Sequence, residues 1–117
     1  MVSFIDSFVR VAYTLHRIGD MATVKRTAEF DKWLKALRDV RAKAKVLVRI
    51  DRLALGNPGD AAPVGQGVSE MRIDFGPGYR IYFAQKGDTA TLLYGGDKHS
   101  QRADIAKAKA IAQELED

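Results

Sequence analysis

The chain has 117 residues, of which 46% are hydrophobic and 29% charged, a balance that is typical of one soluble globular domain with its own hydrophobic core. It contains no cysteine, which excludes disulfide and thiolate chemistry and favours the reducing cytoplasm. Nineteen Lys and Arg against fifteen Asp and Glu give a net charge of +4, a mild positive bias that is compatible with an anionic partner without requiring one.

Residues 1–20 are expected to form an amphipathic helix appended to a single main domain of residues 21–117. Six apolar side chains recur in this segment at helical spacing, namely Phe4, Phe8, Val11, Ala12, Leu15 and Ile18. Charged residues such as Asp6 and Arg17 interrupt it, and it has neither a basic leader nor a small-residue cleavage site, so a secretory signal or a membrane span is not expected. Met21 opens a stretch that itself reads like a natural beginning, so we interpret the segment as an extension or an upstream start.

The first half of the main domain is predicted to form a strand followed by a helical hairpin. Residues 22–27 alternate in the manner of a short strand, and Thr27 is placed to cap the helix that follows. A tight break at residues 38–39 separates this helix from a second one, which Gly56, Asn57 and Pro58 end. The predicted core stripes are Phe30, Trp33, Leu34 and Leu37 on the first helix, and Val40, Ala44, Leu47, Val48 and Leu55 on the second.

The second half is predicted to form a meander of strands and a last helix. Residues 57–67 read as a loop with a brief strand near Val64, and residues 70–83 alternate on either side of a Gly-Pro-Gly turn, which is the pattern of a β-hairpin. An apolar strand follows and is expected to end at Gly95 and Gly96, after which Ser100 is placed to cap the final helix. The expected fold is therefore α+β, with two N-terminal helices packed on one face of a twisted antiparallel β-sheet, a C-terminal helix, and the other face left free.

The free face of the expected sheet carries the candidate functional residues. Side chains alternate along a strand, so Arg72, Arg80 and Tyr82 share one face, while the apolar set of the hairpin takes the other. Lys98 and His99 come directly after the neighbouring strand and are expected to overhang the same face. The spacing leaves two interpretations open: a functional site, and a basic surface that is merely solvated.

The chemistry of these residues narrows the kind of site. His16 and His99 do not form a ligand-spaced cluster, so no metal is expected, and no cofactor motif or phosphate-binding loop is present. Asp74 is expected to pair with an arginine. Clustered Arg and Lys without a metal suit cleavage of RNA through its own 2′-hydroxyl, because guanidinium groups bind the charge that builds on the phosphoryl oxygens. Tyr82 is suited to stacking a base or shuttling a proton in such a site.

Three stretches resemble the toxins of bacterial type II toxin–antitoxin modules in the RelE/ParE superfamily, and within it the HigB-like branch of addiction-module killer proteins. They are VKRTAEFDKWLKALRD, GVSEMRIDFGPGYRIYF and LLYGGDKHSQRADIAKAKAIA, and together they cover the chain after its first twenty residues. The resemblance implies a RelE-like microdomain that inhibits growth as an mRNA interferase, a metal-independent endoribonuclease that cleaves messenger RNA, usually in the ribosomal A site. It also implies neutralisation by a small antitoxin, commonly a helix-turn-helix DNA-binding protein, with operator DNA contacted only through the complex and no membrane involved.

The resemblance assigns roles by position. It implies that Arg80 contacts the scissile phosphate, that Arg72 positions the substrate, and that Lys98 stabilises charge in the transition state or on the leaving group. Tyr82 and His99 are further site residues of this set.

One departure from the family pattern leaves the general acid and base open. Ribosome-dependent members often carry a C-terminal tyrosine near the site, and here Asp104 or Ile105 takes its place, with His99 as one substitute. Two other functions stay open beside the ribonuclease. One is a ParE-type toxin that inhibits DNA gyrase through a protein contact, and the other is an inactive module that only binds an antitoxin.

Overall fold

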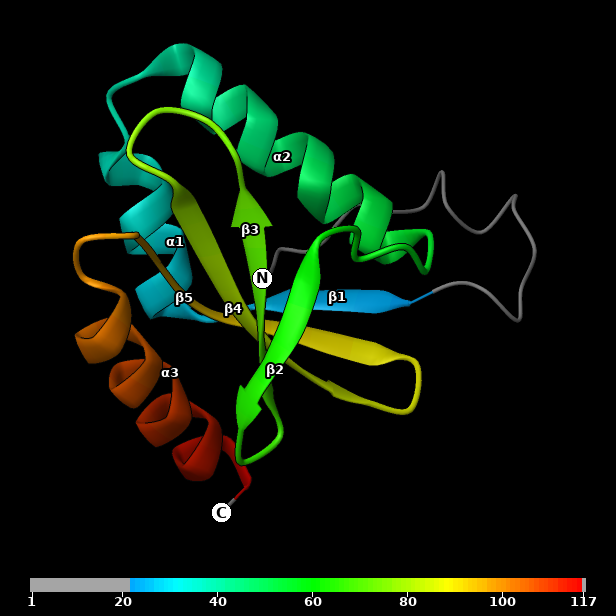
Figure 1. The fold of residues 1–117 in the computed structure, drawn as a ribbon. Helices are drawn as coiled ribbons and strands as arrows, with labels where there is room; N and C mark the ends of the chain where they lie inside the picture. Colours follow the sequence, from blue (N-terminus) through cyan, green and yellow to red (C-terminus); the bar gives the residue numbers. More distant parts are fainter. Residues whose placement is uncertain (1–21, 117) are drawn as a thin grey trace.

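The computed structural model describes residues 22–116, and the helix expected in residues 1–20 lies outside this range. The described part forms a five-stranded sheet in the order β1-β5-β4-β3-β2, with helices on both of its faces (Figure 1). The strands are β1 (Thr23–Arg26), β2 (Ala61–Gly65), β3 (Val68–Ile73), β4 (Tyr79–Lys86) and β5 (Thr89–Asp97).

The sheet is mixed, which corrects the expectation of a wholly antiparallel one. β2, β3, β4 and β5 form the predicted antiparallel meander, and β3 pairs with β4 as a hairpin in which Ile73 lies opposite Tyr79. β1, however, pairs in parallel with β5. Parallel neighbours need a long crossover connection, and two helices and three strands lie between β1 and β5 in the chain. The α+β class itself is confirmed.

The helices α1 (Ala28–Ala36) and α2 (Val40–Ala54) are separated at the predicted break, and α1 starts directly after the expected cap Thr27. Thr27 Oγ1 accepts a hydrogen bond of 3.0 Å from the Phe30 amide, and Asp39 Oδ1 accepts from two amides in the first turn of α2. At the end of α2, Gly56 takes a positive φ of 86°, and the next amides fold back onto carbonyls of the last turn. These caps define the helical hairpin that covers one face of the sheet.

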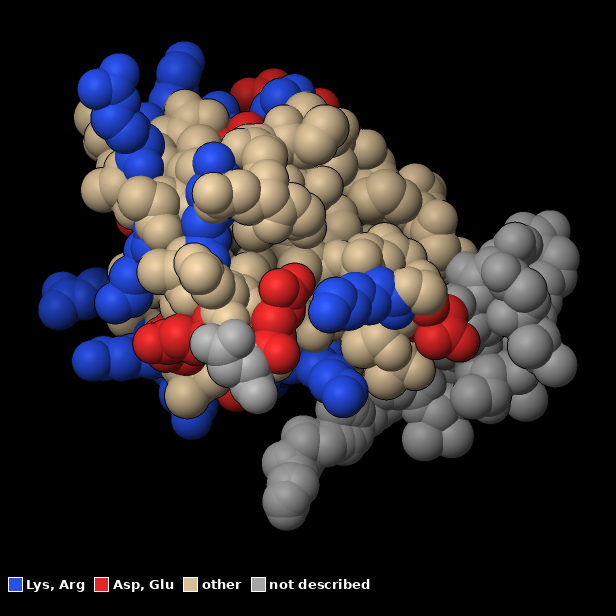
Figure 2. Space-filling model, turned by 90° about the horizontal axis from the view of Figure 1, so that it is seen from below, with Lys and Arg blue, Asp and Glu red and all other residues tan. Residues whose placement is uncertain are grey.

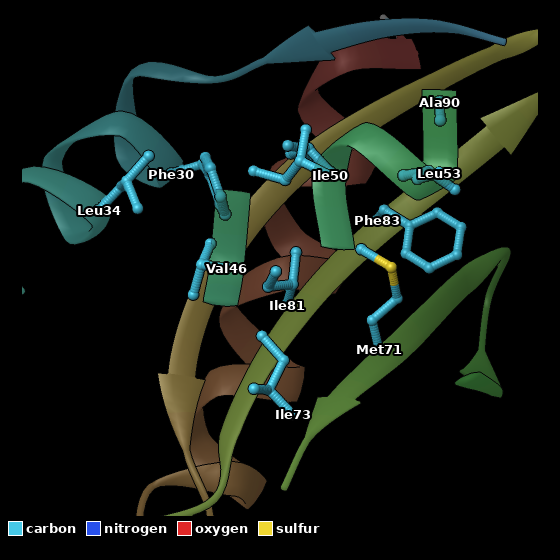
Figure 3. Packing of buried hydrophobic residues seen from close by; sticks show 11 residues of the cluster. Phe30, Leu34, Val46, Ile50, Leu53, Met71, Ile73, Ile81, Phe83 and Ala90 are labelled. Atoms are coloured by element: carbon cyan, nitrogen blue, oxygen red, sulfur yellow. The ribbon is translucent and has the colours of Figure 1, made fainter. Parts of the chain in front are cut away.

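The main hydrophobic core lies between this helical hairpin and the sheet (Figure 3). Phe30 and Leu34 of α1 point into it as predicted, but the core stripe predicted for α2 is wrong. The buried face of α2 consists of Ala42, Val46, Ile50, Leu53 and Ala54, whereas the predicted Val40, Leu47, Val48 and Leu55 are exposed. Apolar residues recur on two sides of this helix, so the helical period alone does not say which side meets the sheet.

The third helix, α3 (Gln101–Glu116), packs on the opposite face of the sheet, so the expectation of a free face is wrong. A second core forms there from Val68, Tyr82, Leu93, Ala108 and Ile111. Near the predicted site residues, the accessible region is the end of the molecule where the β3–β4 turn meets the end of β5, at the upper left of Figure 1. Across residues 22–116, none of the helices combines the length and the apolar character that crossing a membrane requires.

β5 runs through the two glycines that were expected to end it and reaches Asp97. A Cβ atom on Gly95 would clash with the Trp33 ring of α1, and one on Gly96 would clash with the Asp104 carboxylate of α3. The glycine pair therefore permits the two helices to approach the same strand from opposite faces, which is a packing role.

Candidate functional site

Two arginines face each other across β3 and β4 on the side of the sheet that α3 covers. Arg72 and Arg80 are direct cross-strand partners. Like charges in this position destabilise a sheet, so the pair needs a counter-charge. Glu70 supplies it from two residues before Arg72: its carboxylate lies 3.2 Å from Arg72 Nε and 3.9 Å from Arg80 Nε. The sequence-predicted arginines are therefore brought together, and a carboxylate lies between them.

Glu70 is 2% exposed, and it connects the hairpin to α3. Its Oε1 accepts a hydrogen bond of 2.8 Å from Gln101 Nε2 in the first turn of that helix. A carboxylate so deeply buried is tolerated only when it is paired and hydrogen-bonded, as this one is. Sequence reasoning missed Glu70 and Gln101, although the spacing of Glu70 from Arg72 places both on one face of the strand.

Arg72 is held a second time by the loop before β2. Its Nη1 lies 3.1 Å from Asp60 Oδ1, so its carboxylate partners are Glu70 and Asp60, and the pairing expected with Asp74 is not the one formed. Arg49 of α2 fixes this loop, because its guanidinium donates to two carbonyls of the loop and to the Arg72 carbonyl. Burial lowers the pKa of Arg49, and the nearby Asp60 opposes this shift.

Arg80 and Lys98 meet at the turn of the β3–β4 hairpin. Gly78 has a positive φ of 81°, and a Cβ atom there would lie 3.4 Å from Lys98 Cβ and 3.5 Å from Arg80 Nη1. The two cationic side chains thus flank one glycine, although they come from different segments. The Arg80 side chain is 13% exposed, whereas Lys98 is open to solvent. The turn therefore presents one oriented guanidinium and one accessible ammonium group.

His99 lies beside this turn. Asp97 Oδ1 accepts hydrogen bonds from the His99 amide at 2.8 Å and from the Ser100 amide at 3.3 Å, which shapes the turn that leads into α3. The imidazole is 86% exposed, and its Nδ1 lies 3.8 Å from Asp97 Oδ1. His99 is accordingly accessible, with the Asp97 carboxylate beside it.

Tyr82 does not belong to an accessible surface, and the expectation that it stacks a base is wrong. It is 0% exposed in the second core, because α3 covers it. Burial raises the pKa of the Tyr82 hydroxyl, and the charge of the nearby Glu70 carboxylate raises it further. Within the described residues, Tyr82 Oη has no partner at hydrogen-bond geometry. The hydroxyl therefore stays protonated and out of reach of a substrate.

Asp104, one of the two residues in place of the family tyrosine, is also buried. The Ser100 hydroxyl, expected to cap α3, instead donates to Asp104 Oδ2. Burial raises the pKa of Asp104, the Ser100 hydrogen bond opposes this shift, and the nearby Asp97 reinforces it. Asp104 is thus a buried carboxyl that lies against Gly96 of β5.

One side of the molecule is rich in positive charge. In Figure 2, which views the molecule from below, Lys and Arg side chains gather along the left of the view, the side on which Figure 1 shows α1 and the start of α3, and acidic side chains are scattered among them and over the rest of the view. Among residues 22–116, no group of His, Cys, Asp and Glu is arranged to hold a metal ion. The cationic side chains that come together at this end of the sheet are those of Arg72, Arg80 and Lys98, which we call the arginine cluster.

The fold is that of a small RelE-like α+β protein. A chain of the toxin–antitoxin complex RelBE2 from Mycobacterium tuberculosis superposes with a TM-score of 0.51 and 20% sequence identity, over 67% of this chain and 92% of that chain. Residues 32–116 match the phage-derived Gp49-like proteins (DUF891), and the chain belongs to this family. An uncharacterized protein of Haemophilus influenzae is 52% identical over 93 residues, which are 79% of this chain and 94% of that protein.

Proposed function

We propose that this protein is the toxin of a type II toxin–antitoxin module, close to the HigB-like branch, and that it cleaves messenger RNA without a metal. The observation that carries the proposal is the meeting of Arg72, Arg80 and Lys98, from three separate segments, at one end of the sheet. The RelE-like fold and the toxin–antitoxin complex among its structural neighbours support it.

In the proposed reaction the substrate supplies its own nucleophile. The 2′-hydroxyl attacks the adjacent phosphorus, the bond to the 5′-oxygen of the next nucleotide breaks, and a 2′,3′-cyclic phosphate remains. Arg80 and Lys98 bind the phosphoryl oxygens on which charge develops, and Arg72 positions the neighbouring backbone. A proton leaves the 2′-hydroxyl and another reaches the 5′-oxygen, and we assign this transfer to His99, whose side chain is exposed.

The partners of such a toxin follow from its substrate. They are messenger RNA on the ribosome and a small antitoxin, expected to be a helix-turn-helix protein that carries the complex to operator DNA. A cytoplasmic location is part of the same proposal, because translated messenger RNA is found there.

The test is cleavage of a defined messenger RNA during translation in vitro, with the 5′ ends of the products mapped. Arg80→Ala or Lys98→Ala should lower the cleavage rate by about 100-fold or more, because each removes charge stabilisation from the transition state. The matched control is Lys107→Ala, an exposed lysine on α3 away from the turn. Cleavage that persists when Arg72, Arg80 and Lys98 are all replaced by alanine contradicts the proposal.

One observation favours a second candidate, a module that binds an antitoxin without cleaving RNA. Both arginines already have a carboxylate partner in Glu70, and Arg72 also has Asp60, so a phosphate must compete with these groups. Wild-type protein that binds its antitoxin but cleaves no RNA supports this candidate. Inhibition of DNA supercoiling by gyrase in the same preparation indicates instead a ParE-type toxin.

A further inference from the structure

We infer that the outer face of α2 is a docking surface for an acidic amphipathic helix of the antitoxin, an inference that rests on the proposed toxin–antitoxin function. Large apolar side chains on this face are exposed: Val40 is 79% exposed, and Leu47, Val48 and Leu55 are between 36% and 46% exposed. The spacing of these residues along the helix places them in one row. We call Val40, Ala44, Leu47, Val48 and Leu55 the α2 stripe.

The α2 stripe is separate from the hydrophobic core. The residues of α2 that pack on the sheet lie on the other side of the helix and are at most 9% exposed. Single exposed apolar residues are ordinary, and Leu115 on α3 is one of them, whereas several exposed apolar residues in one row are typical of an interaction site. The helix thus has one apolar face for the sheet and a second one that faces outward.

Cationic side chains lie on both sides of the α2 stripe. At 100° per residue, Lys43 lies along one side, and Arg41, Lys45 and Arg52 lie along the other. The one acidic residue of α2, Asp51, lies within the row. A helix that buries the stripe brings its own flanking positions against these cations, where Asp and Glu are favoured.

Two of the flanking cations are held in place by the hairpin turn. Arg41 lies 5.6 Å and Lys45 5.1 Å from the centre of the Phe75 ring. Cation–π contacts of this kind reduce the freedom of the two side chains before a partner arrives. The basic border of the stripe is therefore partly preorganised for an acidic ligand.

The same charges disfavour a second copy of the chain as the occupant. Two α2 helices packed antiparallel through their stripes would bring Arg41 or Lys45 of one copy near Arg52 of the other. Like charges placed together across an interface act against that pairing. The charge pattern fits a partner of opposite sign instead.

The α2 stripe and the arginine cluster lie in different layers of the molecule. α2 packs on the face of the sheet that carries Met71 and Ile81, whereas Arg72 and Arg80 lie on the face covered by α3. A helix docked on the stripe therefore anchors the antitoxin without covering the arginine cluster. It follows that removing the stripe should abolish antitoxin binding and leave RNA cleavage intact.

The test uses the full-length chain with the small protein encoded by the adjacent gene as the probe. Leu47→Glu combined with Val48→Glu adds acidic groups to the stripe, and Leu115→Glu on α3 is the matched control. The double variant should bind the probe at least tenfold more weakly and escape its neutralisation in a growth assay, whereas the control should behave as wild type. Arg52→Glu should weaken binding as well, and all variants should keep the wild-type circular dichroism spectrum because the replaced side chains are exposed.

The possible outcomes test the docking surface and the ribonuclease activity independently of each other. Undiminished binding of the probe by the double variant overturns the inference, as does a wild-type chain that binds no probe. A wild-type dimer in sedimentation that the double variant abolishes also overturns it, since the stripe then serves a second copy. Stripe-dependent binding without RNA cleavage by the wild type leaves the docking surface standing and refutes the ribonuclease alone.

Discussion

Arg72 and Arg80 stand opposite each other on adjacent strands, and the buried carboxylate of Glu70 lies within 3.2 Å of one and 3.9 Å of the other. Two guanidinium groups in this relation repel each other, and the carboxylates of Glu70 and Asp60 supply the two counter-charges. An anion that approaches from the hairpin turn, where Lys98 adds a third positive charge, completes the balance. The two arginines are thus packed around the buried Glu70 carboxylate, and together with Lys98 they can bind a further anion.

The first prediction concerns this counter-ion. Glu70→Gln preserves the size of the side chain but leaves the two arginines without their shared carboxylate. The free energy of unfolding should fall by about 1–3 kcal/mol, because charged hydrogen bonds of this kind contribute that much. Urea unfolding measures the loss, with the exposed Glu114→Gln as the control. Equal stability of Glu70→Gln and the wild type would show that the arginine pair does not need Glu70.

Lys98 provides a test of anion binding that is independent of cleavage. Lys98→Ala should weaken binding of a non-cleavable 2′-O-methyl oligoribonucleotide and reduce the slope of log affinity against log salt by about 1, because one phosphate contact is lost. Fluorescence anisotropy over a salt series measures both quantities. Lys107→Ala should leave the slope unchanged, and an unchanged slope for Lys98→Ala excludes a phosphate contact at this residue.

The raised pKa of Asp104 predicts that the free energy of unfolding depends on pH in a definite direction. Burial raises the pKa of this carboxyl above its ordinary value of 3.8, so the folded state holds the proton more tightly than the unfolded state. The stabilising contribution is complete below pH 3.8 and is lost as the pH rises through the raised pKa. Asp104→Asn cannot ionise and still accepts from Ser100. The stability of this variant relative to wild type should therefore increase with pH and then level off. Thermal unfolding in a pH series measures this difference. A difference that does not change with pH would show that the pKa of Asp104 is not raised in the folded state.

Gly95 is predicted to tolerate no side chain. A Cβ atom there meets the Trp33 ring, so Gly95→Ala should cost roughly 1–3 kcal/mol through displacement of α1. Gly87 in the β4–β5 turn is the matched control, because a Cβ atom there meets nothing within 4 Å and only its φ of 58° opposes the change. Gly87→Ala should therefore cost about 1 kcal/mol or less. Comparable urea midpoints for the two variants would show that close packing at Gly95 is unimportant.

The sequence predicted those features that local chemistry decides. The period of two in the hairpin determined which side chains share a face, and Thr27 marked the start of α1, because a cap is a contact within one turn. Long-range packing decided the rest. Which side of α2 meets the sheet, and that α3 covers Tyr82, depend on how distant segments dock, and a helical period carries no such information. Glu70 shares its face with Arg72 by spacing, but its burial comes from Gln101 on the last helix.

The buried Tyr82 leads to the last prediction, which separates a structural residue from a catalytic one. A proton shuttle must reach its substrate, and this hydroxyl is enclosed beneath α3 with a raised pKa. Tyr82→Phe removes a buried hydroxyl that lies close to Glu70 but makes no hydrogen bond of normal geometry in the described part of the chain, so it should change the free energy of unfolding by no more than about 1 kcal/mol and leave RNA cleavage unchanged. Above pH 10.0, the ordinary pKa of tyrosine, the stability of the variant relative to wild type should rise, because the wild type resists an ionisation that its unfolded chain undergoes freely. If Tyr82→Phe loses cleavage but keeps the wild-type affinity for substrate, Tyr82 takes part in the reaction. In that case α3 must move away from the sheet during catalysis.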